Sequence, residues 1–474
     1  MVRPLGMAVL QCSECSASFE PFPPRYRCGK CGGLLEYAYD FEQLSEIRPK
    51  GAFTFWRYRS WLPEIKRTVS MGEGGTPLHG AKRLAKKIGL NTLFIKDETR
   101  NPTNSFRDRC AALMVSNAQD LQYTSLICAS NGNLGASMAA YCAKLGLICH
   151  VIVPKLVDIG KLAQMLIYDA NIEEYGEIVD ESIRRAEHLS KETGWYQATA
   201  ELNPLAIEAQ KTIAYEVVEQ MGVPNWFIVS MGSGGTIRSV WKGFTELRKM
   251  GIIDSIPKLV GVQAVGCAPI VNAHLQKRSE PIVTSKPSTH ALAILVRNPL
   301  HGKWALQALA DSGGTATLVS DSEILAAEQE IARLEGIFAE PASSATIAAL
   351  KKLVSRGVID SEDSVVCLVT GSGLKATDVL QALAKRKKMA GVGLELSTKE
   401  KILHILSQED TYGYDLWKRL GKIMTRAAVY QHLNELLEKG LVTVYELEGK
   451  RYFRITKRGR RVLSAINELK ALLY

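Results

Sequence analysis

From about Gly75 to Leu383 the sequence alternates between short strand-like runs and amphipathic helix-like segments. The runs are apolar and mostly β-branched, and most of them end in Gly, Pro, Ser or Asp. They cover residues 92–97, 125–130, 149–154, 226–232, 258–264 and 365–371, and helical periodicity lies between them at 133–145, 204–221 and 322–335. This rhythm predicts an α/β fold of parallel sheets wrapped by helices, with ligand loops at the carboxyl ends of the strands.

The chain has 474 residues, which is too long for one ordinary core and predicts two or three domains. Hydrophobic residues make up 46% and charged residues 23%, the balance of a globular protein in water. No run reaches the eighteen apolar residues of a membrane span, so no membrane partner is expected. Residues 1–10 lack an apolar signal core and a cleavage site, and we interpret them as a cytoplasmic start.

Two C-x-x-C knuckles lie near the N-terminus, twelve residues apart. They consist of Cys12, Cys15, Cys28 and Cys31. This spacing can place four thiolates around one ion, so it predicts a structural Zn²⁺ in a ribbon within residues 1–45. A ribbon that has lost its metal and a redox site remain the alternatives. The other six cysteines have apolar surroundings and are interpreted as small core residues.

A series of motifs follows in the order GEGGTPL (72–78), KDETRNPTNSFRDR (96–109), ASNGNLGAS (129–137), VPKLVDIGKLAQ (153–164), LNPLAIEAQKTIAYE (202–216), GSGGT (232–236), GVQAVGCAPI (261–270), EPASSAT (340–346) and TGSGLK (370–375). Together they resemble the threonine synthases, fold-type II enzymes of the tryptophan synthase β superfamily that use pyridoxal phosphate (PLP). The resemblance implies that residues 46–385 form a core of two parallel-sheet α/β subdomains.

The glycine-rich loop Gly232, Ser233, Gly234, Gly235 and Thr236 lies between a predicted strand and a predicted helix. Backbone N–H groups, hydroxyls and the helix dipole make such a loop a phosphate site, although alone it is often a simple turn. By resemblance, it would hold the phosphate of PLP.

Other residues of the expected ligand site are indicated by the resemblance alone. Asn133 would bond the 3′-oxygen of PLP, and the Thr370 hydroxyl would face the pyridine nitrogen. Ser130, Asn131 and Gly132 would receive the carboxylate of a ligand. In isolation, Asn133 and Thr370 could equally be ordinary turn residues.

Arg107 stands where the family motif N-P-T-G-S-F-K-D-R has its Schiff-base lysine. A Schiff base needs an amine that can become neutral, and a guanidinium stays charged. Arginine is instead a fork-shaped anion binder. Asn104, Asn131 and Leu134 also depart from the family pattern. The alternative is an enzyme that tolerates the change or recruits another amine.

A second domain is predicted over residues 397–474, after a basic, glycine-containing linker at 386–396. Helices at 398–408, 412–421 and 425–440 precede a hairpin at 441–456 and a last helix at 457–473, which is the order of a winged helix-turn-helix. The domain resembles PadR-type regulators. It holds fifteen Lys and Arg against nine Asp and Glu, a net of +6 in a chain of net +10. This asymmetry indicates a polyanion partner, with a solvated surface as the alternative.

One face of the third helix of this domain is polar and one is apolar. Val429, Leu433, Leu436 and Leu437 follow core spacing. The residues expected to contact double-stranded operator DNA are Arg426, Gln431 and Asn434 at base edges, and Lys450 and Arg451 at the hairpin tip. A winged helix used for protein contacts is the alternative. The apolar last helix suggests a homodimer, which would suit a palindromic site.

Two hypotheses follow for the whole chain. In the first, a pseudoenzyme core senses a small anionic amino acid, a phosphorylated amino acid or noncovalent PLP, and the winged helix regulates transcription of genes of amino-acid metabolism. In the second, the core is a working lyase that converts O-phosphohomoserine and water to threonine and phosphate, and carries an appended winged helix.

Overall fold

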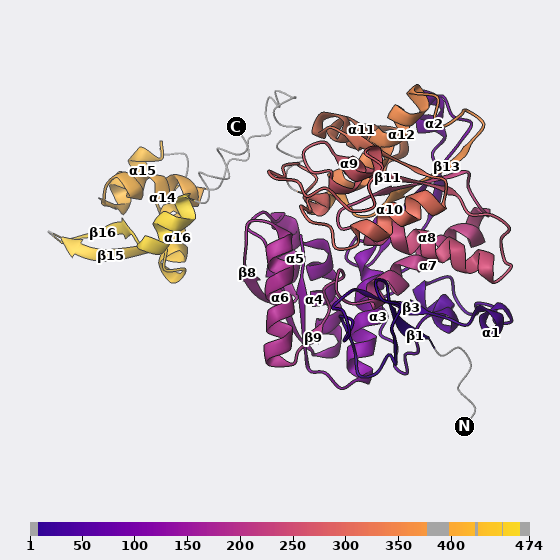
Figure 1. Ribbon diagram of the computed structural model, residues 1–474. Helices are drawn as coiled ribbons and strands as arrows, with labels where there is room; N and C mark the ends of the chain where they lie inside the picture. The colour runs from indigo at the N-terminus through magenta and orange to yellow at the C-terminus, as the bar shows by residue number, and fades with distance from the viewer. Residues whose placement is uncertain (1–7, 377–397, 422–424, 448, 465–474) are drawn as a thin grey trace. The chain divides into compact units, whose positions relative to one another are not determined.

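The computed structural model describes residues 8–376, 398–421, 425–447 and 449–464, in two compact units divided between residues 377 and 378 (Figure 1). The predicted linker at 386–396 lies outside the described residues. No helix within the described ranges is long and apolar enough to cross a membrane.

The larger sheet of the first unit has six strands in the order β12-β11-β10-β13-β5-β4. All neighbours are parallel except the edge strand β4, which runs antiparallel to β5. Figure 1 shows α8 to α12 around these strands. The strands are β4 (Leu78–Gly80), β5 (Thr92–Asp97), β10 (Trp226–Ser230), β11 (Lys258–Ala264), β12 (Thr315–Val319) and β13 (Ser364–Val369).

The smaller sheet has four parallel strands in the order β8-β7-β6-β9. They are β6 (Ser125–Ala129), β7 (Ile148–Val153), β8 (Asn171–Glu174) and β9 (Tyr196–Gln197), among the helices α4 (Asn133–Leu145), α5 (Ile159–Ile167) and α6 (Val179–Thr193). The parallel α/β architecture predicted from the sequence is therefore confirmed. Buried aliphatic side chains fill the space between sheets and helices in both halves.

The remaining helices of this unit cover the sheets or join them. They are α1 (Phe41–Ser45), α2 (Lys82–Ile88), α3 (Arg107–Asp120), α7 (Leu205–Met221), α8 (Gly235–Lys249), α9 (Pro269–Leu275), α10 (Gly302–Asp311), α11 (Asp321–Glu335) and α12 (Pro341–Ser355). Helix α11 starts at a capping box, because Ser320 and Glu323 each bond the other's backbone N–H. Four short 3₁₀ turns complete the unit: η1 (Phe55–Trp61), η2 (Glu98–Arg100), η3 (Leu292–Ile294) and η4 (Gly373–Lys375).

Helix α3 is anchored by ion pairs that are fully buried. The Arg109 guanidinium donates to Glu98 at 2.7 Å and to Glu216 of α7 at 2.5 Å, and Lys96 Nζ donates to Glu216 at 2.7 Å. Removing one member of such a set leaves an uncompensated buried charge, at a cost of about 3–5 kcal/mol. The network therefore fixes the start of α3, which carries Arg107.

The N-terminal ribbon is a three-stranded antiparallel sheet of β1 (Val9–Cys12), β2 (Ser18–Phe19) and β3 (Leu35–Ala38). It contacts both halves of the core. Arg27 pairs with Glu187 of α6 at 3.2 Å, and Glu36 accepts two bonds from Arg238 of α8 at 2.8 and 2.9 Å. These charge-assisted bonds tie the ribbon to helices of the two sheets.

The second unit has the winged-helix order: α14 (Thr398–Gln408), β14 (Thr411–Tyr412), α15 (Gly413–Arg419), α16 (Arg426–Glu438), β15 (Val442–Leu447) and β16 (Lys450–Ile455). Its antiparallel sheet runs β14-β16-β15. Residues 457–464 are helical, and the rest of the predicted last helix lies outside the described residues, as does Glu448 of the predicted hairpin. Val429, Leu433 and Leu436 are buried as expected, and Leu437 is half-buried.

Candidate functional site

A cavity lies where strands of both sheets end. Strands β6, β10 and β13 reach its wall with Ala129, Ser230 and Thr370, the last one residue beyond β13. Its space free of protein atoms is about 890 Å³ when the open mouth is included. Of the residues predicted for the ligand site, those lining the cavity are Arg107, Ser130, Asn131, Asn133, Gly232, Ser233, Gly234, Gly235, Thr236 and Thr370, with Leu134 beside them.

The loop 232–236 connects β10 to the N-terminus of α8 and forms one end of the cavity. Gly234 has a φ of +94°, and a Cβ there would lie 2.7 Å from the carbonyl oxygen of His301, so only glycine fits. The Ser233 hydroxyl is buried and has no hydrogen-bond partner among the described residues. The Thr236 hydroxyl donates to Gln210 at 2.9 Å and can still accept. An open N-terminal turn with an unsatisfied hydroxyl suits a phosphate.

The loop 130–132 and the start of α4 form a second wall. The Ser130 hydroxyl accepts from Gly132 N at 2.9 Å and from Gly135 N at 3.0 Å, which fixes the loop internally. Gly132 has a φ of +121°, and a Cβ there would lie 2.4 Å from the Lys161 side chain. Gly132 itself belongs to the loop without lining the cavity.

Asn133 lies between this loop and α12. Its Nδ2 donates to both carboxylate oxygens of Glu340, at 2.9 and 3.1 Å, and its Oδ1 is buried without a partner in the described part of the chain. Burial opposes ionisation of Glu340, but Lys161, whose Nζ lies 3.0 Å away, and Lys375 hold the pKa of this carboxyl below its usual value. Asn133 is therefore held next to a carboxylate.

Thr370 connects the cavity to α12. Its hydroxyl lies 2.9 Å from the Ser343 hydroxyl, and Ser343 also accepts from Thr370 N at 3.0 Å. The Thr370 carbonyl accepts from Phe106 N at 2.9 Å, which places Arg107 directly beside this segment.

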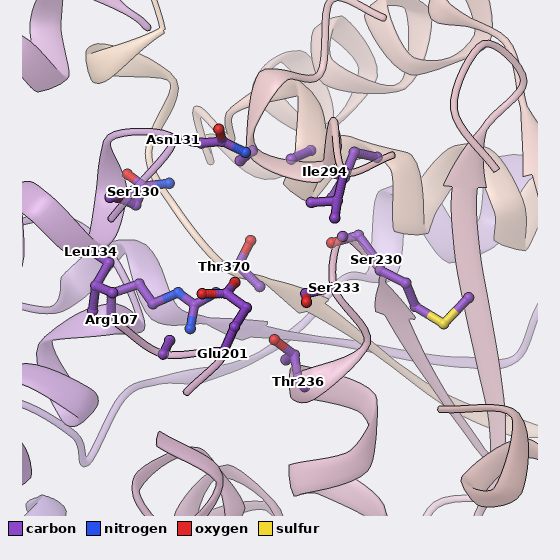
Figure 2. A pocket seen from close by; sticks show the side chains of 18 of the residues that line it. Arg107, Ser130, Asn131, Leu134, Glu201, Ser230, Ser233, Thr236, Ile294 and Thr370 are labelled. Carbon is purple, nitrogen blue, oxygen red and sulfur yellow. The ribbon is translucent and has the colours of Figure 1, made fainter. Parts of the chain in front are cut away.

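Arg107 is the first residue of α3 and is half-buried in the cavity wall. Its guanidinium carbon lies 4.7 Å from the centre of the Phe106 ring, and Figure 2 shows the guanidinium extending toward Glu201. Burial raises the pKa of the Glu201 carboxyl, and the charge of Arg107 opposes that rise. The cavity thus contains a facing cation and anion.

No lysine lines the cavity within the described residues. The buried lysines nearby have other partners: Lys161 pairs with Asp158 at 2.7 Å, and Lys375 Nζ donates to the Thr103 carbonyl at 2.7 Å. Lys96 pairs with Glu216 at 2.7 Å, and Lys211 pairs with Glu208 at 2.5 Å.

Several lining residues are not indicated by the sequence. Glu201 follows β9, Gln210 belongs to α7, and Glu340 caps α12. His301 packs its ring against the glycine loop, and burial lowers its pKa to about 4, so it is neutral at pH 7. Only the pairing of distant loops brings these four to one cavity. Gln210 and Glu340 lie within the motifs 202–216 and 340–346, but the motifs do not single them out, and Glu201 and His301 lie outside every motif.

The four ribbon cysteines converge. Their sulfur atoms all lie within 4.8 Å of one another, with Cys12–Cys31 at 3.4 Å, Cys15–Cys31 at 3.5 Å and Cys15–Cys28 at 3.6 Å. Bonds of about 2.3 Å to a tetrahedral Zn²⁺ imply sulfur separations of roughly 3.8 Å. The cluster therefore has the donor set and the spacing of a structural metal centre.

The second unit presents all five of its predicted DNA-contacting residues at the surface. Arg426, Gln431 and Asn434 are exposed on α16, and Lys450 and Arg451 are exposed at the start of β16. The Arg426 guanidinium carbon lies 4.7 Å from the Tyr414 ring centre and 4.9 Å from that of Trp417, so α15 supports this side chain.

Comparisons with known proteins agree with this architecture. Residues 69–371 match the family described as pyridoxal-phosphate dependent enzyme, and residues 402–465 match the transcriptional regulator PadR-like family. The threonine synthase of Methanocaldococcus jannaschii is 41% identical over 378 residues, covering 78% of this chain and 93% of that protein. The threonine synthase of Methanosarcina acetivorans is 40% identical over 374 residues, covering 77% and 92%.

Solved structures support the fold of the core. Maize serine racemase aligns with a TM-score of 0.56 at 18% identity, over 66% of this chain and 92% of that one. Threonine deaminase isoform 2 of Solanum lycopersicum aligns with a TM-score of 0.55 at 22% identity, over 67% and 88%. The chain belongs to the pyridoxal-phosphate dependent enzyme family, as a fold-type II relative of the threonine synthases that carries a PadR-like domain at its C-terminal end.

Proposed function

We propose that this protein is a ligand-sensing, DNA-binding transcription regulator of amino-acid metabolism whose threonine-synthase-like core acts as a binding pocket. The observation that supports the proposal is that Arg107, the first residue of α3, lines the cavity. By the motif resemblance, Arg107 would take the place of the Schiff-base lysine. No lysine, and so no side-chain amine, lines the cavity in the part of the chain that the structure describes. On this proposal the core is a pseudoenzyme.

The chemistry of arginine is the physical basis. A lysine amine becomes neutral with a modest pKa shift and then attacks an aldehyde, whereas a guanidinium keeps its charge throughout the physiological range. Arg107 can bind an anion, but it cannot anchor PLP covalently or take up and return protons during a replacement reaction. Leu134 adds an apolar side chain to the same wall.

The residues present fit the phosphate of PLP but not its covalent attachment. The loop 232–236 would hold the phosphate, with the Ser233 hydroxyl available as a donor. Asn133 and Thr370 would lie along the pyridine ring. When bound, PLP supplies an electron sink for reactions of amino acids. This site is equally suited to a noncovalent phosphorylated ligand, whose carboxylate would lie at Arg107 and the adjoining loop of Ser130, Asn131 and Gly132.

The winged-helix unit would bind double-stranded operator DNA. Gln431 and Asn434 on α16 have the donors and acceptors that read adenine, Arg426 suits guanine, and Lys450 and Arg451 would contact the backbone. We include a homodimer in the proposal, because a two-fold pair of recognition helices reads a palindromic site. The four ribbon cysteines would hold a structural Zn²⁺.

An active threonine synthase is the second candidate. It is favoured by the 41% identity to the Methanocaldococcus jannaschii enzyme over 93% of its length, and by the retained phosphate loop. Such an enzyme would use an amine other than the residue at position 107 to convert O-phosphohomoserine and water to threonine and phosphate.

One experiment separates the two candidates. The full-length protein is purified, incubated with PLP, treated with borohydride and digested for mass spectrometry, and phosphate release from O-phosphohomoserine is measured in parallel. We expect no lysine-linked PLP, no absorbance of such a linkage and no phosphate release. A stoichiometric PLP adduct on one lysine, or turnover above that of a heat-treated sample, would establish the enzyme.

DNA binding is tested with the native upstream region of the gene. We expect a shifted complex that weakens with salt, because phosphate contacts release counterions. Gln431→Ala should relax sequence preference and Lys450→Ala should reduce the salt slope by about one. Binding that is unchanged in both variants would contradict the proposed interface.

A further inference from the structure

Two opposite charges reach the cavity from separate parts of the chain. Arg107 enters from the first turn of α3, and Glu201 enters from the loop between β9 and α7. Figure 2 shows the guanidinium and the carboxylate facing each other, with Thr236 of the phosphate loop beyond Glu201. Both side chains are half-buried, so both are accessible from the cavity.

The two groups do not form a close pair. No ion pair within 4 Å joins Arg107 to Glu201, although many such pairs occur elsewhere among the described residues. Placing a carboxylate in a half-buried position is unfavourable, and burial raises the pKa of Glu201 although the charge of Arg107 opposes that rise. A ligand that supplies a cation at Glu201 would therefore gain from this carboxylate.

A free amino acid has the matching chemistry. At neutral pH it carries an ammonium and a carboxylate on one carbon, and a carboxylate and a guanidinium are their natural partners. Without a lysine-bound aldehyde in the cavity, the amino group of the ligand is not consumed and keeps its charge. The phosphate loop, with its free Ser233 hydroxyl, offers a third anchoring point in the same cavity.

We infer that Glu201 and Arg107 form a zwitterion subsite, in which Glu201 binds the ammonium and Arg107 the carboxylate of a phosphorylated α-amino acid whose phosphate occupies the loop 232–236. The inference rests on the proposed function, because it requires a cavity in which no lysine captures PLP. It deepens that proposal by assigning a partner to the ammonium, which is recognised by an ionic contact rather than by covalent chemistry.

The test compares two ligands that differ only in the ammonium. Full-length protein is dialysed to remove bound small molecules and titrated in a calorimeter with O-phospho-L-homoserine and with 4-(phosphonooxy)butanoate, which keeps the phosphate and carboxylate but lacks the amino group. We expect the wild-type protein to prefer the amino compound by about ten- to hundredfold, the range of a hydrogen bond between charged groups.

Glu201→Gln keeps the shape of the side chain and removes its charge. We expect this variant to lose the preference and to bind the two ligands with similar affinity. Glu192→Gln is the matched control, because Glu192 is an exposed residue of α6 that pairs with His188, and it should retain the preference. Comparison of the two ligands on the wild-type protein remains informative even if Glu201→Gln folds poorly.

Three results would overturn the inference. They are equal affinity of the wild-type protein for both ligands, tighter binding of both ligands by Glu201→Gln, and no binding of either. Tighter binding would mean that Glu201 only neutralises Arg107. Failure of the proposed function has a different readout, because it would appear as PLP trapped on a lysine or as phosphate release, whatever the ligand preference.

Discussion

The Arg107 side chain stays protonated where a lysine side chain could become neutral. The backbone at Arg107 is held in a defined position. The segment before it is held by the bond from Phe106 N to the Thr370 carbonyl at 2.9 Å. A lysine introduced at this position would therefore enter the same cavity.

We predict that Arg107→Lys gains the ability to link PLP covalently. The reason is that a half-buried lysine amine can lose its proton, whereas a guanidinium cannot. The measurement is the absorbance of the PLP-loaded variant, followed by borohydride trapping and peptide mapping to residue 107. Arg107→Met is the control and should trap nothing. An Arg107→Lys variant that also traps nothing would show that other residues of the cavity have lost competence.

Glu328 of α11 gives a prediction about pH. Its side chain is 2% exposed, and neither carboxylate oxygen has a partner within the described ranges. Burial, with a smaller contribution from Glu340, raises its pKa to about 8 from 4.5. The unfolded chain ionises this group at lower pH than the folded protein does. Its contribution to stability is therefore complete below about pH 4.5 and is lost as the pH rises through 8.

Replacing Glu328 by Gln should remove this loss. We expect the free energy of unfolding at pH 8.5 to rise by about 2–4 kcal/mol, with a change below about 1 kcal/mol at pH 4. Denaturant titrations at several pH values measure it. Glu330→Gln on the same helix is the control, because it removes a carboxylate that is 2.7 Å from Lys351. It should leave the pH dependence of the free energy of unfolding in place. An identical pH profile for Glu328→Gln would mean that Glu328 is ionised when folded.

The cavity residues that were predicted from the sequence lie on loops that a local sequence pattern marks. The glycine loop 232–236 and the segment 130–133 each follow an apolar strand and begin a helix, so pattern and motif resemblance both point to them. Glu201 lacks such a signature, because an acidic residue after a two-residue strand is common at any surface. Its approach to Arg107 depends on how the loop after β9 meets the start of α3.

At the scale of elements, the buried strands were predictable and the edge strands were not. The runs at 92–97 and 258–264 match β5 and β11 in full, because interior strands of a mostly parallel sheet are largely apolar. Strand β8 reads Asn-Ile-Glu-Glu and lies at the edge of its sheet, where polar side chains face solvent. Strand β9 has only two residues and gives no periodicity to detect.

The ribbon is the element whose stability should depend most on a metal. Its four cysteines make three short sulfur–sulfur contacts and its core is small, so little else holds its knuckles together. We predict that the purified protein contains one Zn²⁺ per chain and that a strong chelator lowers the first unfolding midpoint by at least about 5 °C. Metal analysis and thermal scans measure both quantities.

Cys15→Ser supplies the control for the chelator. This variant should contain no zinc, should already show the lower midpoint and should not respond further to chelation. Because the ribbon pairs with α6 and α8 through Arg27 and Glu36, its loss should also loosen those helices in hydrogen exchange. Full metal content in Cys15→Ser would contradict a four-cysteine site.

For the whole molecule, the segment 370–376 is the structural connection between the cavity and the chain leading to the winged-helix unit. Thr370 lines the cavity, and the following residues bond to the segment that precedes Arg107: Ser372 N donates to the Asn104 carbonyl at 3.1 Å, and Lys375 Nζ donates to the Thr103 carbonyl at 2.7 Å. Burial lowers the pKa of Lys375 to about 8, so its bond to Thr103 is formed by a poorly solvated amine. Movement of Arg107 would therefore displace the segment 370–376.

The last prediction concerns coupling between ligand and DNA. If ligand binding at Arg107 shifts the segment 370–376, O-phospho-L-homoserine should change the affinity for operator DNA by about 5- to 150-fold, and DNA should change the affinity for the ligand by the same factor. Fluorescence anisotropy with labelled operator, at saturating and zero ligand, measures the first factor, and calorimetry with and without DNA measures the second. Lys375→Met should bind ligand and DNA but show a smaller factor. Lys351→Met, at a half-buried pair with Glu330 outside the cavity, should behave as wild type. Only a ligand that binds two states of the protein with different affinities can shift the equilibrium between them. If the ligand binds the wild-type protein tightly without changing its affinity for DNA, ligand binding and DNA binding are not coupled.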